Sequence, residues 1–217
     1  MTVLYFFPEE LRTPWYMWEQ RWNEIQEIRL RVNCPVSIRT ISSERFLLNK
    51  EGERVIYSDR EMELIFRHLC HDSIYAYEEE RKQGYMTLTG GHRVGITGEV
   101  IRVEQGYIVK YIRYMNIRIA HEVVGIGESI REYMYDGGMP CNSLIISPPA
   151  AGKTTLLRDM VRMYADGNGQ YRGINVGVID ERGEIAGACR GSASLHCGIR
   201  TDIITGGNKR GGVEILV

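Results

Sequence analysis

The stretch that decides the fold of the C-terminal part is NSLIISPPAAGKTTLLRD, residues 142–159. Its first six residues form a short apolar run, which is typical of a buried parallel strand. Residues 153–165 place apolar side chains on one side of a predicted helix. A second apolar run, residues 174–179, predicts another buried strand. Strand, helix and strand in this order indicate a βαβ unit and therefore an α/β fold.

The residues between the predicted strand and helix have the spacing of a P-loop, Gly-x-x-x-x-Gly-Lys-Ser/Thr, with Ser147 in place of the first glycine. Gly152 lets the backbone approach a phosphate closely, and the N–H groups of the helix N-terminus attract an anion. Lys153 can reach the β- and γ-phosphates of ATP, and the Thr154 hydroxyl can bind Mg²⁺. The predicted nucleotide site therefore consists of Ser147, Pro148, Pro149, Ala150, Ala151, Gly152, Lys153, Thr154 and Thr155.

The same residues have a simpler explanation, which is an ordinary helix N-terminus that happens to carry a lysine. Ala150 stands where many such loops have a second glycine, and a positive φ at Ala150 would cost about 1–2 kcal/mol. The position of the Gly-Lys-Thr tripeptide between a buried strand and an amphipathic helix favours the nucleotide site.

The composition limits the classes of function. The 217 residues are 43% hydrophobic and 25% charged, which is typical of a globular protein. The net charge of −1 argues against nucleic-acid or membrane binding through bulk charge. No apolar run reaches the ~18 residues of a membrane span, and the N-terminus has no secretory signal. Five cysteines without a Cys-x-x-Cys pair fit reduced thiols in the cytoplasm.

A turn-rich stretch, DGGMP, begins at Asp136 and predicts a domain boundary. We expect an N-terminal α+β domain over 1–136 and the P-loop domain over 137–217. The elements predicted for the first domain are a helix with Trp15, Trp18, Trp22 and Ile25 on its apolar face, a strand over 36–41, helices after Ser58 and over 74–83, a hairpin of 93–103 with 107–112, and a strand over 116–120.

Several separated segments resemble the stage III sporulation protein AA family, whose motor core is similar to the ATPases of type II secretion and type IV pili. Besides the P-loop, they are EIRLR (27–31), IYAYEE (74–79), GGHRVG (90–95), NIRIA (116–120), VIDER (178–182) and GIRTD (198–202). The resemblance implies an α+β domain followed by a RecA-like P-loop NTPase core, with ATP and Mg²⁺ as ligands.

The resemblance also implies a biological setting. Such motors usually act as hexamers, and this family is implied to power a channel between mother cell and forespore. The expected partners are further copies of the chain and membrane-embedded channel proteins, with no nucleic acid and no membrane insertion of the chain itself. The expected location is the mother-cell cytoplasm, at the forespore membrane.

A P-loop ATPase needs a Walker B acid at the end of a later strand. Asp180 and Glu181 follow the strand directly after the P-loop helix, whereas the Walker B strand of RecA-like cores comes one strand later. The core is therefore predicted to stop before Walker B, which leaves two alternatives: an ATPase, or a non-catalytic relative that binds only nucleotide or partners.

Similarity to secretion ATPases implies that an acid at this position can polarise the attacking water. The candidates for this general base are Glu181 and, as the alternative, Asp180. The simpler reading is that Asp180 caps a helix and that Glu181 is solvated.

Weaker candidates complete the set. Arginines that could act on the γ-phosphate of a neighbouring subunit are Arg93, Arg118 and Arg200, although a surface arginine is the more common case. The Arg-rich strands of the N-terminal domain leave a nucleic-acid module as an alternative, against which the net charge argues. Zinc binding by His68, Cys70 and His71, and a nucleophile among Cys189, His196 and Cys197, are both disfavoured.

Overall fold

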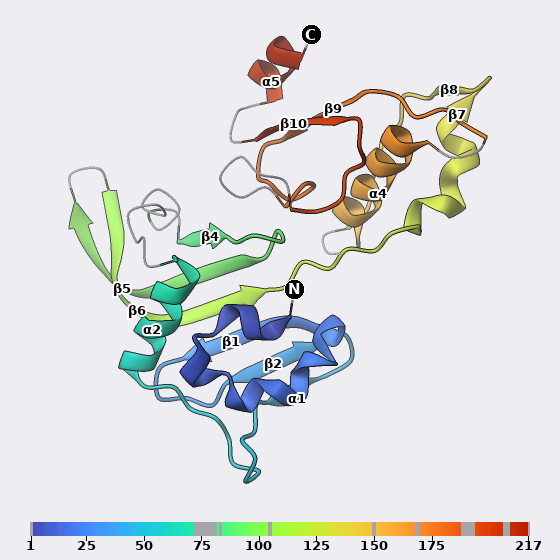
Figure 1. Ribbon diagram of the computed structural model, residues 1–217. Helices are drawn as coiled ribbons and strands as arrows, with labels where there is room; N and C mark the ends of the chain where they lie inside the picture. Colours follow the sequence, from blue (N-terminus) through green and yellow to red (C-terminus); the bar gives the residue numbers. More distant parts are fainter. Residues whose placement is uncertain are drawn as a thin grey trace. The chain divides into compact units, whose positions relative to one another are not determined.

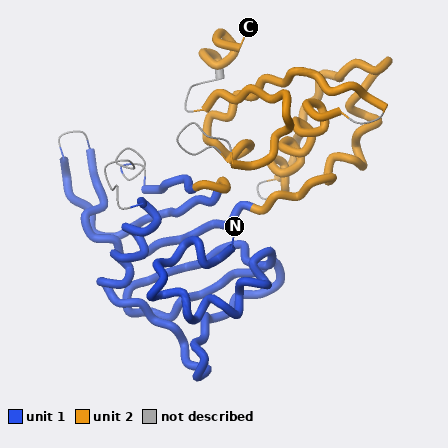
Figure 2. Tube along the Cα trace, in the orientation of Figure 1, with its two compact units in different colours: residues 1–88, 92–120 blue, residues 89–91, 121–217 orange. Residues whose placement is uncertain are grey.

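The structure is a computed structural model that describes residues 2–71, 82, 84–103, 106–148, 151–167, 170–187, 194–205 and 209–216. It divides into two compact units (Figure 2). Unit 1 comprises Met1–Leu88 and His92–Ala120, and unit 2 comprises Thr89–Gly91 and His121–Val217. The domain boundary predicted at 136/137 stays a prediction. These residues lie within unit 2, at the turn of a short hairpin.

Unit 1 is built on a six-stranded antiparallel sheet with the strand order β3-β2-β1-β6-β5-β4 (Figure 1). The central strand β1 pairs with β2 on one side and with β6 on the other. The strands are β1 (Ile25–Arg31), β2 (Ser37–Thr40), β3 (Glu44–Phe46), β4 (Tyr85–Thr87), β5 (Arg93–Val103) and β6 (Gly106–Arg118).

One face of this sheet carries the core of unit 1. Alternate residues of the central strands belong to this core. The helical segments of the N-terminal half cover this face (Figure 1). These segments are η1 (Val3–Phe6), η2 (Glu9–Leu11), η3 (Thr13–Trp15), α1 (Tyr16–Glu19), η4 (Trp22–Glu24) and α2 (Asp59–Leu69). Because side chains alternate along a strand, the other residues of β1, β5 and β6 form an opposite face, which is largely polar.

The structure corrects the helix predicted along the tryptophans. Trp15 and Trp18 are buried in the core, as predicted. The segment is not one helix, however, because α1 has only four residues and Ile25 already begins β1. Hydrogen bonds to β2 on one edge and to β6 on the other stabilise β1. A helix that continued from Trp15 into Ile25 would lose part of this pairing.

Other predictions for unit 1 are confirmed. Ser58 and Glu61 form the reciprocal capping box at the start of α2. β2 lies within the predicted strand 36–41, and β5 and β6 form the predicted hairpin. The prediction of a separate strand over 116–120 is wrong. Strand β6 continues through a register shift as far as Arg118 and includes the first residues of this segment. The helix over 74–83 lies outside the described residues, apart from Lys82.

Unit 2 is a small α/β assembly. Strands β9 (Val176–Asp180) and β10 (Thr201–Thr205) pair in parallel, and Val161 of helix α4 packs in one cluster with Val178 of β9. The other elements are η6 (Ile126–Met134), β7 (Tyr135–Asp136), β8 (Met139–Pro140), α4 (Lys153–Asp166) and α5 (Lys209–Leu216). The predicted helix and second strand are confirmed as α4 and β9, and the mixed α/β class is confirmed for the chain.

The first strand of the predicted βαβ unit is absent. Residues 141–148 have no regular secondary structure, and Leu144 and Ile146 are 83% and 82% exposed. A parallel strand depends on hydrogen bonds to its neighbours and on burial of both faces. No described strand pairs with this segment, so its apolar side chains have nothing to pack against.

No helix among the described residues is both long enough and apolar enough to cross a bilayer.

Candidate phosphate-binding site

The predicted phosphate loop leads into α4. Gly152 directly precedes the helix with φ +85°, a left-handed conformation that glycine adopts without strain. No side chain caps the first turn of α4. The N–H groups of that turn and the helix dipole therefore remain available to an anion.

Lys153 binds back onto the loop that precedes it. Its Nζ donates hydrogen bonds to the carbonyl oxygens of Ser147, at 2.9 Å, and Pro148, at 2.8 Å, and lies 3.3 Å from the Ser147 hydroxyl. These contacts bring together residues at both ends of the predicted loop. They also place the ammonium group at the N-terminus of α4, where phosphate oxygens could replace the carbonyl oxygens as its acceptors.

The remaining predicted loop residues have less defined roles. Ala151 is exposed, and Thr154 and Thr155 are half-buried in the first turn of α4. Pro149 and Ala150 lie outside the described residues. A threonine hydroxyl at this position has the donor chemistry of a Mg²⁺ ligand, so Thr154 fits the ion that a bound nucleotide would carry.

Asp180 and Glu181 have very different surroundings. The Asp180 carboxylate is buried and accepts hydrogen bonds from the backbone N–H groups of Glu184, Ile185 and Ala186, each at 2.9 Å. Glu181 is exposed. Asp180 therefore caps the turn after β9, and the proposed base Glu181 begins that turn.

Arg158 connects this turn to the phosphate-loop helix. Its guanidinium, on α4, is buried and donates to the carbonyl oxygens of Glu184, at 2.7 Å, and Ile185. Burial lowers the pKa of Arg158, and the nearby Cys197, Glu122 and Asp180 oppose that shift. Asp180 and Arg158 thus hold the same turn from two elements, five residues along α4 from Lys153.

Asp159 holds a second segment against α4. Its buried carboxylate accepts from the backbone N–H groups of Gly127, at 2.7 Å, and Gly125, at 3.0 Å, and from Arg162 Nε at 2.8 Å. A Cβ at Gly127 would lie 2.8 Å from the Met163 sulfur and 3.2 Å from Asp159 Oδ2, so glycine lets this segment approach α4 without moving these side chains. Burial alone would raise the pKa of Asp159, but the hydrogen bonds from Gly127, Gly125 and Arg162 together lower it.

This lowered pKa predicts an acid-sensitive unit 2. An aspartate with a depressed pKa stabilises the fold above its unfolded value of about 3.9, and the stability is lost as the pH falls through the folded value. The free energy of unfolding of Asp159→Asn should therefore depend less on pH in the acid range than that of the wild type. Urea titrations across that range test this, with the exposed Asp202→Asn as control. Identical pH dependence in wild type and Asp159→Asn would contradict it.

Each of the three candidate arginines contacts a different group of its own chain. Arg200 Nη1 donates to the carbonyl oxygen of Ala165 at 2.8 Å, which is about 18 Å along α4 from Lys153. In unit 1, Arg93 lies over the Tyr85 ring, and Arg118 Nε is 3.7 Å from Glu27. Arg200 therefore does not line the phosphate loop of its own chain, and action in a neighbouring subunit stays a prediction.

The disfavoured clusters have structural contacts of their own. His68 Nε2 lies 3.0 Å from the carbonyl oxygen of Tyr5, and Cys197 is buried in the core of unit 2, where burial raises the pKa of its thiol. Cys189 lies outside the described residues. Within the described part of the chain, no group of three or more His, Cys, Asp or Glu side chains could hold a metal ion.

Arg158 and Asp159 are not among the site residues predicted from the sequence. Both lie in the stretch LLRD of the predicted helix, where two charged residues follow apolar ones, and this pattern is the signal that the sequence offers. Their partners, Ile185 and Gly127, are distant in sequence, so the contacts could not be predicted from spacing.

Comparison with known sequences gives the family. A family model described as sporulation stage III, protein AA, matches residues 8–217. Stage III sporulation protein AA of Bacillus subtilis (strain 168) is 39% identical over 205 residues, which cover 92% of this chain. The chain belongs to the stage III sporulation protein AA family. It spans 63% of the length of that curated relative.

Solved structures of secretion and pilus ATPases are also similar. The Legionella pneumophila ATPase DotB matches with 13% identity and a TM-score of 0.45, over 92% of this chain and 52% of DotB. The pilus retraction motor PilT, solved with bound ADP, matches with 13% identity and a TM-score of 0.47, over 90% and 51%. Scores below 0.5 do not establish a shared fold, so the family assignment rests on the sequence.

Proposed function

We propose that this chain binds Mg-ATP at the phosphate loop and serves as an ATPase subunit in sporulation. One observation carries the proposal: the Lys153 ammonium lies at the uncapped N-terminus of α4, and its hydrogen bonds among the described residues go to loop oxygens that phosphate oxygens can replace. Family membership supports the sporulation role.

Each residue of the loop then has a defined task. The Lys153 ammonium binds the β- and γ-phosphates, and the N–H groups around Gly152 bind the remaining phosphate oxygens. The Thr154 hydroxyl holds the Mg²⁺ ion, which neutralises phosphate charge. Arg158 and Asp180 position the turn that carries Glu181.

We assign to Glu181 the task of accepting a proton from the attacking water. Its exposure leaves the carboxylate free for this role, whereas the Asp180 oxygens are occupied by three N–H groups. Glu181→Gln should lower ATP turnover by about 10²-fold or more, a common loss for a general base. Its affinity for Mg-ATP should stay within about twofold of wild type, because neutral glutamine leaves the loop unchanged.

Steady-state phosphate release and equilibrium titration measure these two quantities. Glu132→Gln, an exposed residue of η6, is the matched control and should match wild type in both. Unchanged turnover in Glu181→Gln would transfer the role to another group.

The proposal includes the setting that the family resemblance implies. The chain assembles with further copies, as a hexamer, and acts with membrane-embedded channel proteins in the mother-cell cytoplasm at the forespore membrane. Analytical ultracentrifugation with and without Mg-ATP tests the assembly.

A second candidate is a non-catalytic relative that binds only nucleotide or partners. The absence of the predicted strand over 142–147 favours it, because an ATPase core of this class needs a strand before its phosphate loop. Turnover above that of a Lys153→Ala control would exclude this candidate.

The direct test of the main proposal is a calorimetric titration of the 217-residue chain with Mg-ATP. Saturable binding is expected. No measurable binding by a chain whose circular dichroism shows a folded state would contradict the proposal.

A further inference from the structure

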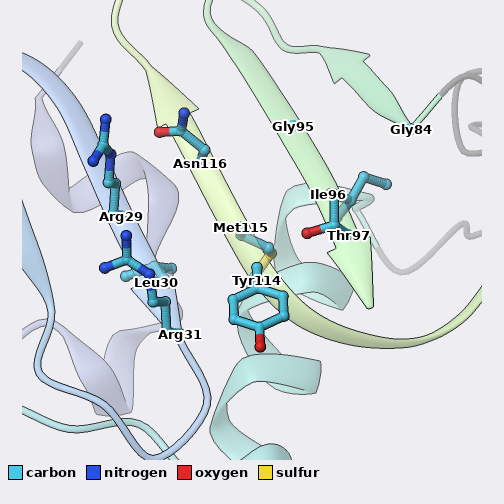
Figure 3. A pocket seen from close by; sticks show the side chains of 10 residues that line it. All are labelled: Arg29, Leu30, Arg31, Gly84, Gly95, Ile96, Thr97, Tyr114, Met115 and Asn116. Carbon is cyan, nitrogen blue, oxygen red and sulfur yellow. The ribbon is translucent and has the colours of Figure 1, made fainter. Parts of the chain in front are cut away.

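The polar face of the unit 1 sheet contains a groove with unused binding groups. On this face, β1, β6 and β5 place residues side by side, in the registers Arg29–Asn116–Gly95 and Arg31–Tyr114–Thr97. The groove between them has a volume of about 320 Å³. Figure 3 shows the two arginines on β1, Tyr114 and Asn116 on the middle strand β6, and Gly95 and Thr97 on β5.

Gly95 creates the space in the groove. It lies in the middle of three paired strands, and its missing side chain leaves room between Asn116 and β4. A Cβ at Gly95 would meet its nearest neighbour, the carbonyl oxygen of Asn116, at 3.9 Å, which is an ordinary contact. A Cβ at this position therefore meets no backbone clash, and the branched side chain of valine would take up space in the groove.

The groove is positively charged, and one of its arginines has no partner among the described residues. Arg29 pairs with Glu27, and Arg118 lies 3.7 Å from the same carboxylate, so two arginines share one acid. The Arg31 side chain has no ion pair or hydrogen bond with any described residue. An unpaired guanidinium at the edge of a groove is a binding group for a phosphate or carboxylate.

Asn116 adds a second requirement. Its Oδ1 is buried and accepts no hydrogen bond from the described part of the chain. Buried acceptors nearly always have a donor, and a turn of the Asn116 side chain toward the groove would let this oxygen accept one from a ligand. The Tyr114 side chain beside it is 51% exposed and offers an aromatic surface. A simple carboxylate would satisfy Arg31 but would leave Asn116 Oδ1 without a donor.

We propose that this groove binds a phosphate ester that carries a hydroxyl or amino group close to the phosphate. Arg31 binds the phosphate oxygens, with Arg29 beside it, and the ligand's hydroxyl or amino group donates to Asn116 Oδ1. Such an ester can be the headgroup of an anionic phospholipid or a soluble compound such as glycerol 3-phosphate. The site lies in unit 1 and does not depend on the phosphate loop of unit 2.

The test uses the full chain carrying Lys153→Ala, so that the phosphate loop does not contribute. Glycerol 3-phosphate is titrated by calorimetry, and co-sedimentation is measured with vesicles of phosphatidylcholine, with and without phosphatidylglycerol. Arg31→Ala should weaken binding about tenfold or more, because it removes a charge-assisted hydrogen bond. Gly95→Val should abolish binding by filling the groove.

Arg102→Ala, on the exposed end of β5, removes the same charge away from the groove and should change binding by no more than about twofold. The circular dichroism of each variant controls for folding. Because the Arg31 side chain makes no hydrogen bond or ion pair with a described residue, Arg31→Ala keeps the test valid even if Gly95→Val fails to fold.

The outcomes separate the two sources of the ester. Groove-dependent binding to both probes supports a lipid headgroup, and binding to glycerol 3-phosphate alone supports a soluble ester. If Arg31→Ala and Gly95→Val both left vesicle binding unchanged, the binding would come from general surface charge. This result would overturn the proposal. Absence of binding to both probes would also overturn it.

Discussion

Replacing Lys153 with alanine is expected to lower the affinity of the chain for Mg-ATP by about 100-fold. The ammonium group would lose charge-assisted hydrogen bonds to phosphate, which are worth about 1.5–3 kcal/mol each, and 1.4 kcal/mol corresponds to tenfold in affinity. No other basic side chain among the described residues contacts Ser147 or Pro148, so none stands ready to replace it. Calorimetric titration of wild type and variant measures the effect.

The control for this prediction is Lys110→Ala, which removes an exposed lysine from β6 in unit 1. Its affinity for Mg-ATP should equal that of the wild type. If Lys153→Ala bound Mg-ATP as tightly as the wild type, the loop would not be the nucleotide site, even though the sequence pattern fits.

The second large effect concerns stability. Asp180→Ala should destabilise unit 2 by about 3 kcal/mol or more, because three backbone N–H groups would lose their acceptor and each unsatisfied group costs about 1–3 kcal/mol. Total stabilities are typically about 5–15 kcal/mol, so this loss approaches complete unfolding. Glu181→Ala, one residue further on and exposed, should change stability by no more than about 0.5 kcal/mol.

The three tryptophans make this measurement specific. Trp15, Trp18 and Trp22 all lie in unit 1, so tryptophan fluorescence reports unit 1. Far-ultraviolet circular dichroism reports both units. Urea unfolding of Asp180→Ala should shift the circular dichroism transition and leave the fluorescence transition in place. Equal stability of Asp180→Ala and Glu181→Ala would show that the cap contributes little.

The parts of the fold with local signals could be predicted from the sequence. Helix α4 has regular apolar spacing and a glycine at its start, and α2 has a reciprocal capping box. Strand β1 could not be predicted in the same way. Its preceding residues have helical spacing, and only pairing with β2 and β6, which are distant in sequence, decides in favour of a strand. The prediction of a strand over 142–147 is wrong for a related reason, because no described strand pairs with this segment.

The candidate site divides in the same manner. The phosphate loop is a contiguous motif, so its residues could be predicted, and the structure brings Lys153 to Ser147 and Pro148. The groups that hold the surrounding segments are not contiguous. Arg158 and Asp159 bind backbone atoms 26 to 34 residues away, and sequence spacing carries no information about such contacts.

The exposed apolar run over 142–147 affects how the chain is recognised by chaperones and proteases in a cell. Leu144 and Ile146 present the kind of surface that chaperones and proteases recognise as unfinished folding. Ser147 ends this run and also accepts a hydrogen bond from Lys153. A chaperone or protease that binds the run as far as Ser147 would therefore compete with a nucleotide bound at the phosphate loop.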